Sequence, residues 1–266
     1  MRLIDSHSHV QSEAFDRDRS EVISAARGAG VERMLVPGWD LPSSRAALSV
    51  CAEFALDAGA GIHPHLARDS DRDWRAVSNL ARDPAVAAVG ETGLDYDRGF
   101  SSRDDQLANL RRHLQLAGEL NKPAILHCRS KPGERDAQDD LLRELDDAGR
   151  PPALLHSFSG PVDYAQRALD MGLSISFSGL AFRKGEEATA AVARVVPDDR
   201  LLVETDCPYL APPGAPRRRN EPQYVEITAR WVAEQRGRNP DGLGDLLVAN
   251  YDRLFRREMG FGQSGR

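Results

Sequence analysis

Leu3-Ile4-Asp5-Ser6-His7-Ser8-His9 begins the chain with a short apolar run that is followed at once by two histidines. Side chains at i and i+2 of an extended segment point to the same face, so His7 and His9 are expected to lie together. The same pattern, an apolar run that ends in a histidine or a carboxylate, recurs at His63, Glu91, His127, His156 and Asp206. The pattern indicates both the fold and the kind of site that the fold carries.

Eight short apolar runs alternate with longer amphipathic stretches. The expected strands are residues 3–7, 33–37, 58–63, 85–91, 124–127, 153–156, 173–177 and 201–206. The expected helices are roughly residues 18–29, 43–57, 71–82, 103–120, 136–148, 162–171, 186–195 and 221–236, with a last helix at about 243–258. Strands this continuously apolar favour parallel pairing that is buried on both faces. We therefore expect an α/β fold, a single-domain (β/α)8 TIM-type barrel over residues 1–266, with a doubly wound open sheet as the alternative.

The C-terminal ends of all strands of such a barrel meet at one mouth. The residues that would converge there are His7, His9, Glu91, His127, His156 and Asp206. Buried carboxylates are costly without partners, and divalent metal ions are suitable partners. Four histidines and two carboxylates can hold two ions if one carboxylate bridges them.

Glu91 is the best candidate for the bridging ligand. Many barrel hydrolases use a carboxylated lysine for this role, but Lys122 precedes the fifth expected strand and Lys131 follows it by several residues. We assign one ion to His7, His9, Glu91 and Asp206, and the other to Glu91, His127 and His156. Zinc or manganese suits these ligands better than magnesium. The site predicts hydrolysis in which Asp206 orients the attacking water or takes its proton.

Composition restricts the class of protein. The chain has 266 residues, a formal net charge of −6, 41% hydrophobic and 29% charged residues. It has no apolar run of about 20 residues and no secretion signal, so no membrane partner is expected. Its three cysteines suit a reducing cytoplasm, where we expect a monomer. The negative charge disfavours a protein that coats nucleic acid, but it allows a nuclease that binds a few phosphates.

Several stretches together resemble one known family. They are Asp5–His9, Gly61–His65, Gly90–Tyr96, Lys122–Arg129, His156–Gly160, Leu201–Pro212, Arg219–Pro222 and Asn250–Phe255. In this order they are similar to the TatD family of metal-dependent deoxyribonucleases, within the wider amidohydrolase-like barrel hydrolases. The resemblance implies the barrel and exonucleolytic cleavage of DNA phosphodiesters, frequently with magnesium or manganese. It also implies a metal site on the six residues named, with Glu91 bridging and Asp206 catalytic, and His63 and His65 facing the substrate.

Two segments depart from the family pattern. Residues 130–134 read as a small insertion at the rim of the pocket, and Arg217-Arg218-Arg219 replaces a basic loop that usually contains glycine and lysine. Arg129 lies two residues after His127, should share its face, and is expected to contact a phosphate or a nearby carboxylate. The 217–219 loop is expected either to contact phosphate or to be a solvated loop.

Three residues near these motifs are expected to be structural. Strand alternation turns Cys128 and Cys207 away from the site and into the core. His113 is expected on the surface or in helix packing. The functional alternatives are a barrel hydrolase of esters or amides, such as a D-aminoacyl-tRNA deacylase, and a non-catalytic scaffold.

Overall fold

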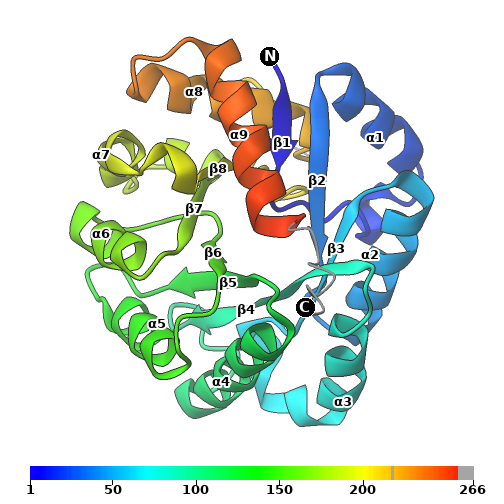
Figure 1. Cartoon of the computed structure of the whole chain (residues 1–266), viewed down its shortest axis with the longest axis vertical. Coiled ribbons are helices and arrows are strands. Elements are labelled where there is room, and N and C mark those ends of the chain that lie inside the picture. Colours follow the sequence, from blue (N-terminus) through cyan, green and yellow to red (C-terminus); the bar gives the residue numbers. More distant parts are fainter. Residues whose placement is uncertain (217–218, 257–266) are drawn as a thin grey trace, which may run out of the picture.

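All strands of the protein belong to one parallel sheet in the order β1 to β8. The structure is a computed structural model and describes residues 1–216 and 219–256. The strands are β1 (Leu3–Asp5), β2 (Val31–Pro37), β3 (Asp57–Ala60), β4 (Val86–Asp95), β5 (Ala124–Arg129), β6 (Ala153–Leu155), β7 (Ser174–Phe177) and β8 (Leu201–Val203). Figure 1 shows the helices arranged around these strands. The expected (β/α)8 barrel is therefore confirmed, and the open sheet is wrong.

A helix follows each strand, as the sequence pattern predicts. The helices are α1 (Arg19–Gly28), α2 (Leu41–Phe54), α3 (Ser70–Ala81), α4 (Arg103–Leu120), α5 (Asp136–Asp147), α6 (Val162–Asp170), α7 (Ala188–Val195), α8 (Val225–Gln235) and α9 (Pro240–Phe255). Short 3-10 turns, η1 (Glu13–Phe15) to η5 (Pro222–Tyr224), lie in the loops. None of the helices in the described ranges is long and apolar enough to span a membrane.

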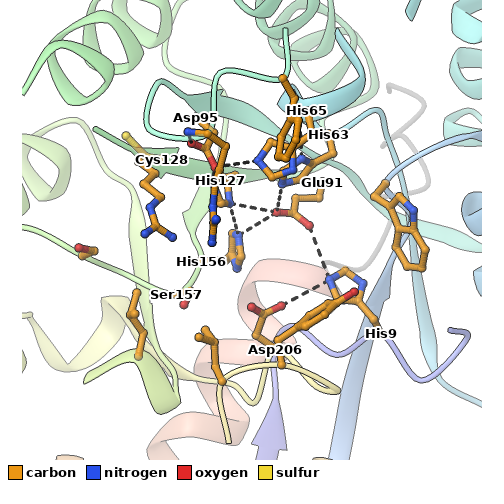
Figure 2. Close-up of a pocket in the computed structure, with 18 of the residues that line it drawn as sticks. His9, His63, His65, Glu91, Asp95, His127, Cys128, His156, Ser157 and Asp206 are labelled. Atoms are coloured by element: carbon orange, nitrogen blue, oxygen red, sulfur yellow. Dashed lines mark hydrogen bonds and ion pairs between the residues drawn. The ribbon is translucent and has the colours of Figure 1, made fainter. Parts of the chain in front are cut away.

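Hydrogen bonds between the segments at the ends of β1 and β8 join the first and last strands of the barrel. The Ser6 N–H donates to the Val203 carbonyl at 3.0 Å, and the Asp206 N–H donates to the His7 carbonyl at 2.9 Å. The segments that carry His7 and Asp206, which lie far apart in the sequence, are thereby joined directly. Asp206 has φ of 55°, a left-handed conformation that turns the chain out of the strand direction. The candidate ligands are brought to one mouth (Figure 2).

Capping residues move two helix starts away from their expected positions. α2 begins at Leu41 because Asp40 accepts the Ser43 N–H at 2.7 Å, with Pro42 in the first turn. α9 begins at Pro240 because Asn239 accepts the Asp241 N–H at 2.8 Å. Both helices therefore start before the apolar periodicity does. The last residues of the helix expected at 243–258 lie outside the described residues.

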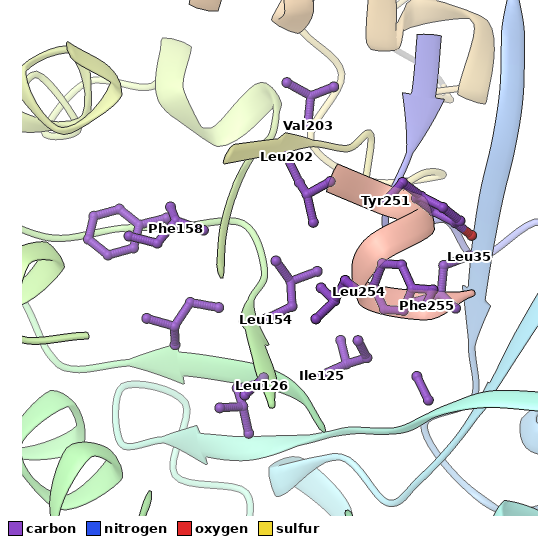
Figure 3. Close-up of a cluster of buried hydrophobic side chains, with 14 of the residues drawn as sticks. Leu35, Ile125, Leu126, Leu154, Phe158, Leu202, Val203, Tyr251, Leu254 and Phe255 are labelled. Atoms are coloured by element: carbon purple, nitrogen blue, oxygen red, sulfur yellow. The ribbon is translucent and has the colours of Figure 1, made fainter. Parts of the chain in front are cut away.

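The core is one cluster of buried aliphatic and aromatic side chains. Figure 3 shows Ile125 of β5, Leu154 of β6 and Leu202 of β8 pointing into the space between the strands, with Leu254 and Phe255 of α9 beside them. Asn250 of α9 donates to the Leu201 carbonyl at 2.8 Å, which ties this helix to the start of β8. The core thus packs between the strands, and the polar residues of the candidate site lie at the C-terminal ends of the strands.

β4 runs four residues further than the sequence indicates, from Val86 to Asp95. It passes so close to β5 that a side chain at Gly93, where φ is 136°, would collide with the carbonyl oxygen of His127. Glu91 and Asp95, four residues apart on one strand, point to the same face. This contact sets two carboxylates beside the histidine of β5.

Candidate metal centre

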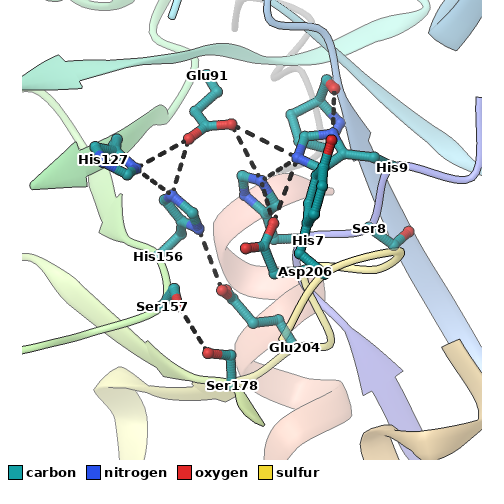
Figure 4. Close-up of polar contacts among 12 residues, drawn as sticks. His7, Ser8, His9, Glu91, His127, His156, Ser157, Ser178, Glu204 and Asp206 are labelled. Carbon is teal, nitrogen blue, oxygen red and sulfur yellow. Dashed lines mark hydrogen bonds and ion pairs between the residues drawn. The ribbon is translucent and has the colours of Figure 1, made fainter. Parts of the chain in front are cut away.

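Glu91 lies at the centre of the site, and its two oxygens face different histidines. Its Oε2 is 3.3 Å from Nε2 of His7 and 3.7 Å from Nε2 of His9. Its Oε1 is 3.3 Å from Nδ1 of His127 and 3.0 Å from Nε2 of His156. Figure 4 shows these side chains converging on the Glu91 carboxylate. A carboxylate placed in this way can bridge two ions.

Asp206 completes the group on the Oε2 side. Its Oδ1 is 3.4 Å from Nε2 of His9 and 3.7 Å from Nε2 of His7. The two Nε2 atoms of His7 and His9 are only 3.1 Å apart. The six candidate ligands thus lie together around Glu91.

Hydrogen-bond partners outside the cluster fix which nitrogen of each ring is free to bind a metal. Nδ1 of His9 lies 3.3 Å from the Pro37 carbonyl and must donate to it, which leaves Nε2 with a lone pair. The His127 ring donates from Nε2 to Oδ2 of Asp95 at 3.2 Å, so its Nδ1 faces Glu91 as an acceptor.

His156 follows the same rule. Its Nδ1 donates to Oε1 of Glu204 at 3.2 Å, which leaves the Nε2 lone pair facing Glu91. Glu204 is fully buried. Carboxylates that hold a ligand histidine in this way are a regular feature of metal sites.

His63 also lies near Glu91, but the ring nitrogen that faces Glu91 carries the proton in this case. Its Nδ1 accepts the His65 N–H at 3.1 Å, so the proton of the neutral ring sits on Nε2. That Nε2 is 3.2 Å from Oε1 of Glu91 and donates to it. Burial lowers the pKa of His63 to about 4, which keeps the ring neutral. His63 is within reach of an ion bound by Glu91 and His127, but its proton makes it a hydrogen-bond donor in this arrangement.

His65 lies further out on the same side. Its Nε2 is 2.8 Å from Oδ2 of Asp95, the same oxygen that holds His127. Asp95 is buried and also accepts the backbone N–H groups of Asp97 and Arg98. Burial acts to raise the pKa of Asp95, but the hydrogen bonds from His127 and His65 outweigh it and lower the pKa. Asp95 therefore stays ionised and links a candidate ligand to a pocket residue.

The donor set fits divalent metal ions. The Nε2 atoms of His7 and His9 face each other and two carboxylate oxygens, an arrangement that a cation between them would stabilise. Burial acts to raise the pKa of Glu91, but the surrounding imidazoles, with His63 and His156 foremost, hold it well below its usual range. The pKa of Asp206 is likewise lowered, because its interactions with the neighbouring imidazoles, His9 foremost, outweigh burial. Nitrogen and oxygen ligands of this kind suit zinc or manganese.

The site opens into a cavity of about 660 Å³. Arg129 lines this cavity, as expected, but its Nε is 2.9 Å from Oδ2 of Asp97, so its charge is already paired. Arg98, which the sequence motifs do not point to, also lines the cavity. Tyr209 and Trp39 lie at its edge beside His9, with ring centroids 6.4 Å and 5.1 Å from the His9 ring.

Neither Arg219 nor residues 131–134 line the cavity. Arg219 pairs with Asp18 at 2.6 Å and with Glu221 at 2.8 Å, and it does not line the cavity. Arg217 and Arg218 lie outside the described residues. Residues 131–134 do not line the cavity, although Arg129 directly before them does, and their reading as an insertion stays a prediction. This loop instead precedes α5, where Ser130 accepts the Ala137 N–H at 3.0 Å.

One of the residues expected to be structural differs from expectation. Cys207 is buried as expected, but Cys128 is partly exposed and lines the cavity, so it is not turned away from the site. His113 is fully buried and packs against Trp74 of α3, so of its two expected roles helix packing is the correct one. Its Nδ1 donates to the Asn109 carbonyl at 2.7 Å, and its Nε2 accepts the Ile62 N–H at 3.1 Å. His113 thereby supports the segment that carries His63.

A parallel barrel with a buried carboxylate and imidazoles at the strand ends defines a metal-dependent barrel hydrolase. Residues 4–256 match the family model of the TatD-related DNases. The chain belongs to this family, so the family expected from the sequence is confirmed.

Relatives cover nearly the whole chain. A Klebsiella pneumoniae protein named 3′-5′ ssDNA/RNA exonuclease TatD is 38% identical over 267 residues, covering 95% of this chain and 97% of that protein. A Bacillus subtilis protein named uncharacterized metal-dependent hydrolase YabD is 34% identical over 258 residues, covering 96% and 99%. The crystal structure of YJJV, a TatD homologue from Escherichia coli, has a TM-score of 0.82 at 26% identity and covers 96% and 98%.

Proposed function

We propose that the protein is a metal-dependent exonuclease that removes nucleotides from the 3′ end of single-stranded DNA or RNA. Three things support this proposal: the family, the named activity of the Klebsiella relative, and the arrangement of the site. The observation that carries it is the Glu91 carboxylate, whose two oxygens each face a separate group of histidine nitrogens. In this proposal the enzyme acts as a monomer in the cytoplasm.

Two divalent ions, of manganese, magnesium or zinc, would be held by His7, His9, Glu91, His127, His156 and Asp206. Bound there, such ions polarise a phosphoryl oxygen and lower the pKa of a water molecule. Glu91 would be shared between both positions. Glu204 and Asp95 keep His156 and His127 in the tautomers that present lone pairs to the site.

Residues at the mouth of the barrel would activate the water and contact the substrate. Asp206, which lines the cavity and keeps a low pKa, would orient the attacking water and accept its proton. His63, which donates to Glu91 through Nε2, would hold that carboxylate in place and face the substrate together with His65. Arginines at the cavity favour a phosphodiester over the alternative substrate, a carboxylic ester such as a D-aminoacyl-tRNA.

The test uses a 5′-fluorescent single-stranded 20-mer with magnesium, manganese or zinc. Stepwise shortening from the 3′ end that a chelator abolishes is the expected result. Glu91→Gln, which keeps the side-chain volume, is expected to lower the rate at least 100-fold, whereas Glu32→Gln on the surface is expected to have no effect. Folded protein that cleaves no oligonucleotide with any of the three metals, or that cleaves aminoacyl esters faster, would contradict the proposal.

A further inference from the structure

Exposed apolar side chains are concentrated at the mouth of the site. Among the described residues, five large hydrophobic side chains are exposed, and Leu66, Phe100 and Tyr209 of these line the cavity. The other two, Val162 and Val195, lie elsewhere. Exposed apolar residues are normally scattered singly, and a group at one opening indicates a surface for apolar parts of a ligand.

The two aromatic rings lie on opposite sides of the metal centre. Phe100 follows β4, and Tyr209 follows β8, which lies four places further round a ring of eight strands. The Phe100 ring is 4.8 Å from the His65 ring, and the Tyr209 ring is 6.4 Å from the His9 ring. Figure 2 shows His65 and His9 on either side of Glu91. Both rings thus line the cavity that contains Glu91, at strands on opposite sides of the barrel.

The exposure of these rings argues against a role in packing alone. Phe100 is 55% exposed and Tyr209 is 61% exposed, so more than half of each side chain is in contact with water. An aromatic ring held in water gains little for the fold, since its contribution to stability comes from the area that it buries. The same exposed face is available to stack on another flat ring.

An unpaired cation lines the same cavity as the two rings. Arg98 is on the same loop as Phe100, is exposed and lines the cavity. No carboxylate in the described part of the chain pairs with its guanidinium, whereas Arg129 is paired with Asp97. A free guanidinium and an exposed aromatic ring that line the same cavity, two residues apart in sequence, match the phosphate and the base of a nucleotide.

We propose that Phe100 and Tyr209 are stacking platforms for the unpaired bases on the two sides of the scissile phosphate, with Arg98 binding a neighbouring phosphate. The inference rests on the proposed exonuclease function and narrows its substrate to ends with at least two unpaired bases. Bases in a duplex already stack on one another and are paired, so a duplex end must fray before it can occupy both rings.

The experiment compares two single-stranded oligothymidylates of ten residues. One is unmodified, and in the other the two 3′-terminal bases are replaced by abasic tetrahydrofuran residues. Stacking on one aromatic side chain corresponds to a factor of roughly 5 to 150 in binding. Phe100→Ala and Tyr209→Ala should each lower kcat/KM on the unmodified oligonucleotide by about such a factor, while cleaving the abasic one as wild type does.

Matched variants separate stacking from other effects. Phe100→Tyr and Tyr209→Phe keep the rings and should retain the wild-type rate, as should Val195→Ala, an exposed apolar residue away from the cavity. Arg98→Gln should lower kcat/KM by about tenfold on both oligonucleotides, because both keep their phosphates.

Three results would overturn the proposal. Equal losses of the alanine variants on both oligonucleotides would show that the rings act only through structure. A wild type that cleaves the abasic oligonucleotide as well as the unmodified one would show that the bases are not bound. Absence of cleavage of either oligonucleotide by folded wild type would refute the exonuclease function itself, and the platforms with it.

Discussion

Replacing Glu204 by glutamine removes a buried negative charge behind His156 and keeps the side-chain volume. Glu204 Oε1 is 3.2 Å from Nδ1 of His156, and Nε2 of the same ring is 3.0 Å from Glu91. The carboxylate holds the ring in the ligand tautomer and makes Nε2 more basic. A hydrogen bond to a charged group contributes about 1.5–3 kcal/mol, which is roughly a 10- to 150-fold change in affinity. We expect Glu204→Gln to weaken manganese binding by about 10- to 100-fold.

The effect of the same substitution on folding should be different. Glu204 Oε2 is buried and has no hydrogen-bond partner within the described residues. An unsatisfied buried polar atom costs about 1–3 kcal/mol, and more when it is charged. Removing the charge should therefore leave the free energy of unfolding of the metal-free protein unchanged or raise it. Glu204→Gln is thus predicted to weaken metal binding without lowering the stability of the metal-free protein.

The assay is calorimetric titration of chelator-stripped protein with Mn²⁺, together with thermal unfolding in EDTA. Glu144→Gln is the control, because Glu144 is equally buried but pairs with Arg111 at 2.7 Å, outside the cavity. It should lower the metal-free Tm and leave manganese affinity unchanged. The reasoning about Glu204 would be refuted by wild-type manganese affinity in Glu204→Gln, or by a Tm loss as large as that of the control.

Two further predictions concern other parts of the chain. Burial lowers the pKa of His113 from 6.5 to about 4, so the unfolded chain binds the extra proton between these pH values. The stability that neutral His113 supplies is thus present above pH 6.5 and is lost as the pH falls to about 4. Over this range, urea unfolding should show that wild type loses about 3 kcal/mol more of its free energy of unfolding than His113→Gln does. Equal losses in the two proteins would contradict this. Arg219→Ala should lower the free energy of unfolding by about 1 kcal/mol through its partly exposed pairs with Asp18 and Glu221, without changing kcat/KM on oligonucleotides. Lost activity at unchanged stability would instead place Arg219 at the substrate.

The strand ends could be predicted because alternation along a buried strand has a fixed period. That rule brought His7 and His9 to one face, and the barrel's geometry brought them to Glu91 and Asp206. The same rule would have reached Asp95 if the fourth strand had been continued past Glu91. Gly90 and Gly93 made a strand that continues to Asp95 hard to predict, since glycine normally weakens a strand.

Other features depend on contacts that sequence order does not reveal. Arg219 is paired with Asp18, 201 residues away, so its charge could not be assigned to the protein or to a phosphate beforehand. Glu204 was visible only as one of two carboxylates after a buried strand, and which of them faces the cavity depends on the left-handed turn at Asp206. The free guanidinium of Arg98 is apparent only after the pairing of Arg129 with Asp97 is known.

The central claim is that Glu91 bridges two metal ions. Anomalous diffraction from crystals of the protein grown with Mn²⁺ tests it most directly. We predict two manganese peaks, one beside His7, His9 and Asp206 and the other beside His127 and His156, with the Glu91 carboxylate between them. Peaks that do not contact Glu91, or an ion bound by His63 in place of His156, would contradict this account.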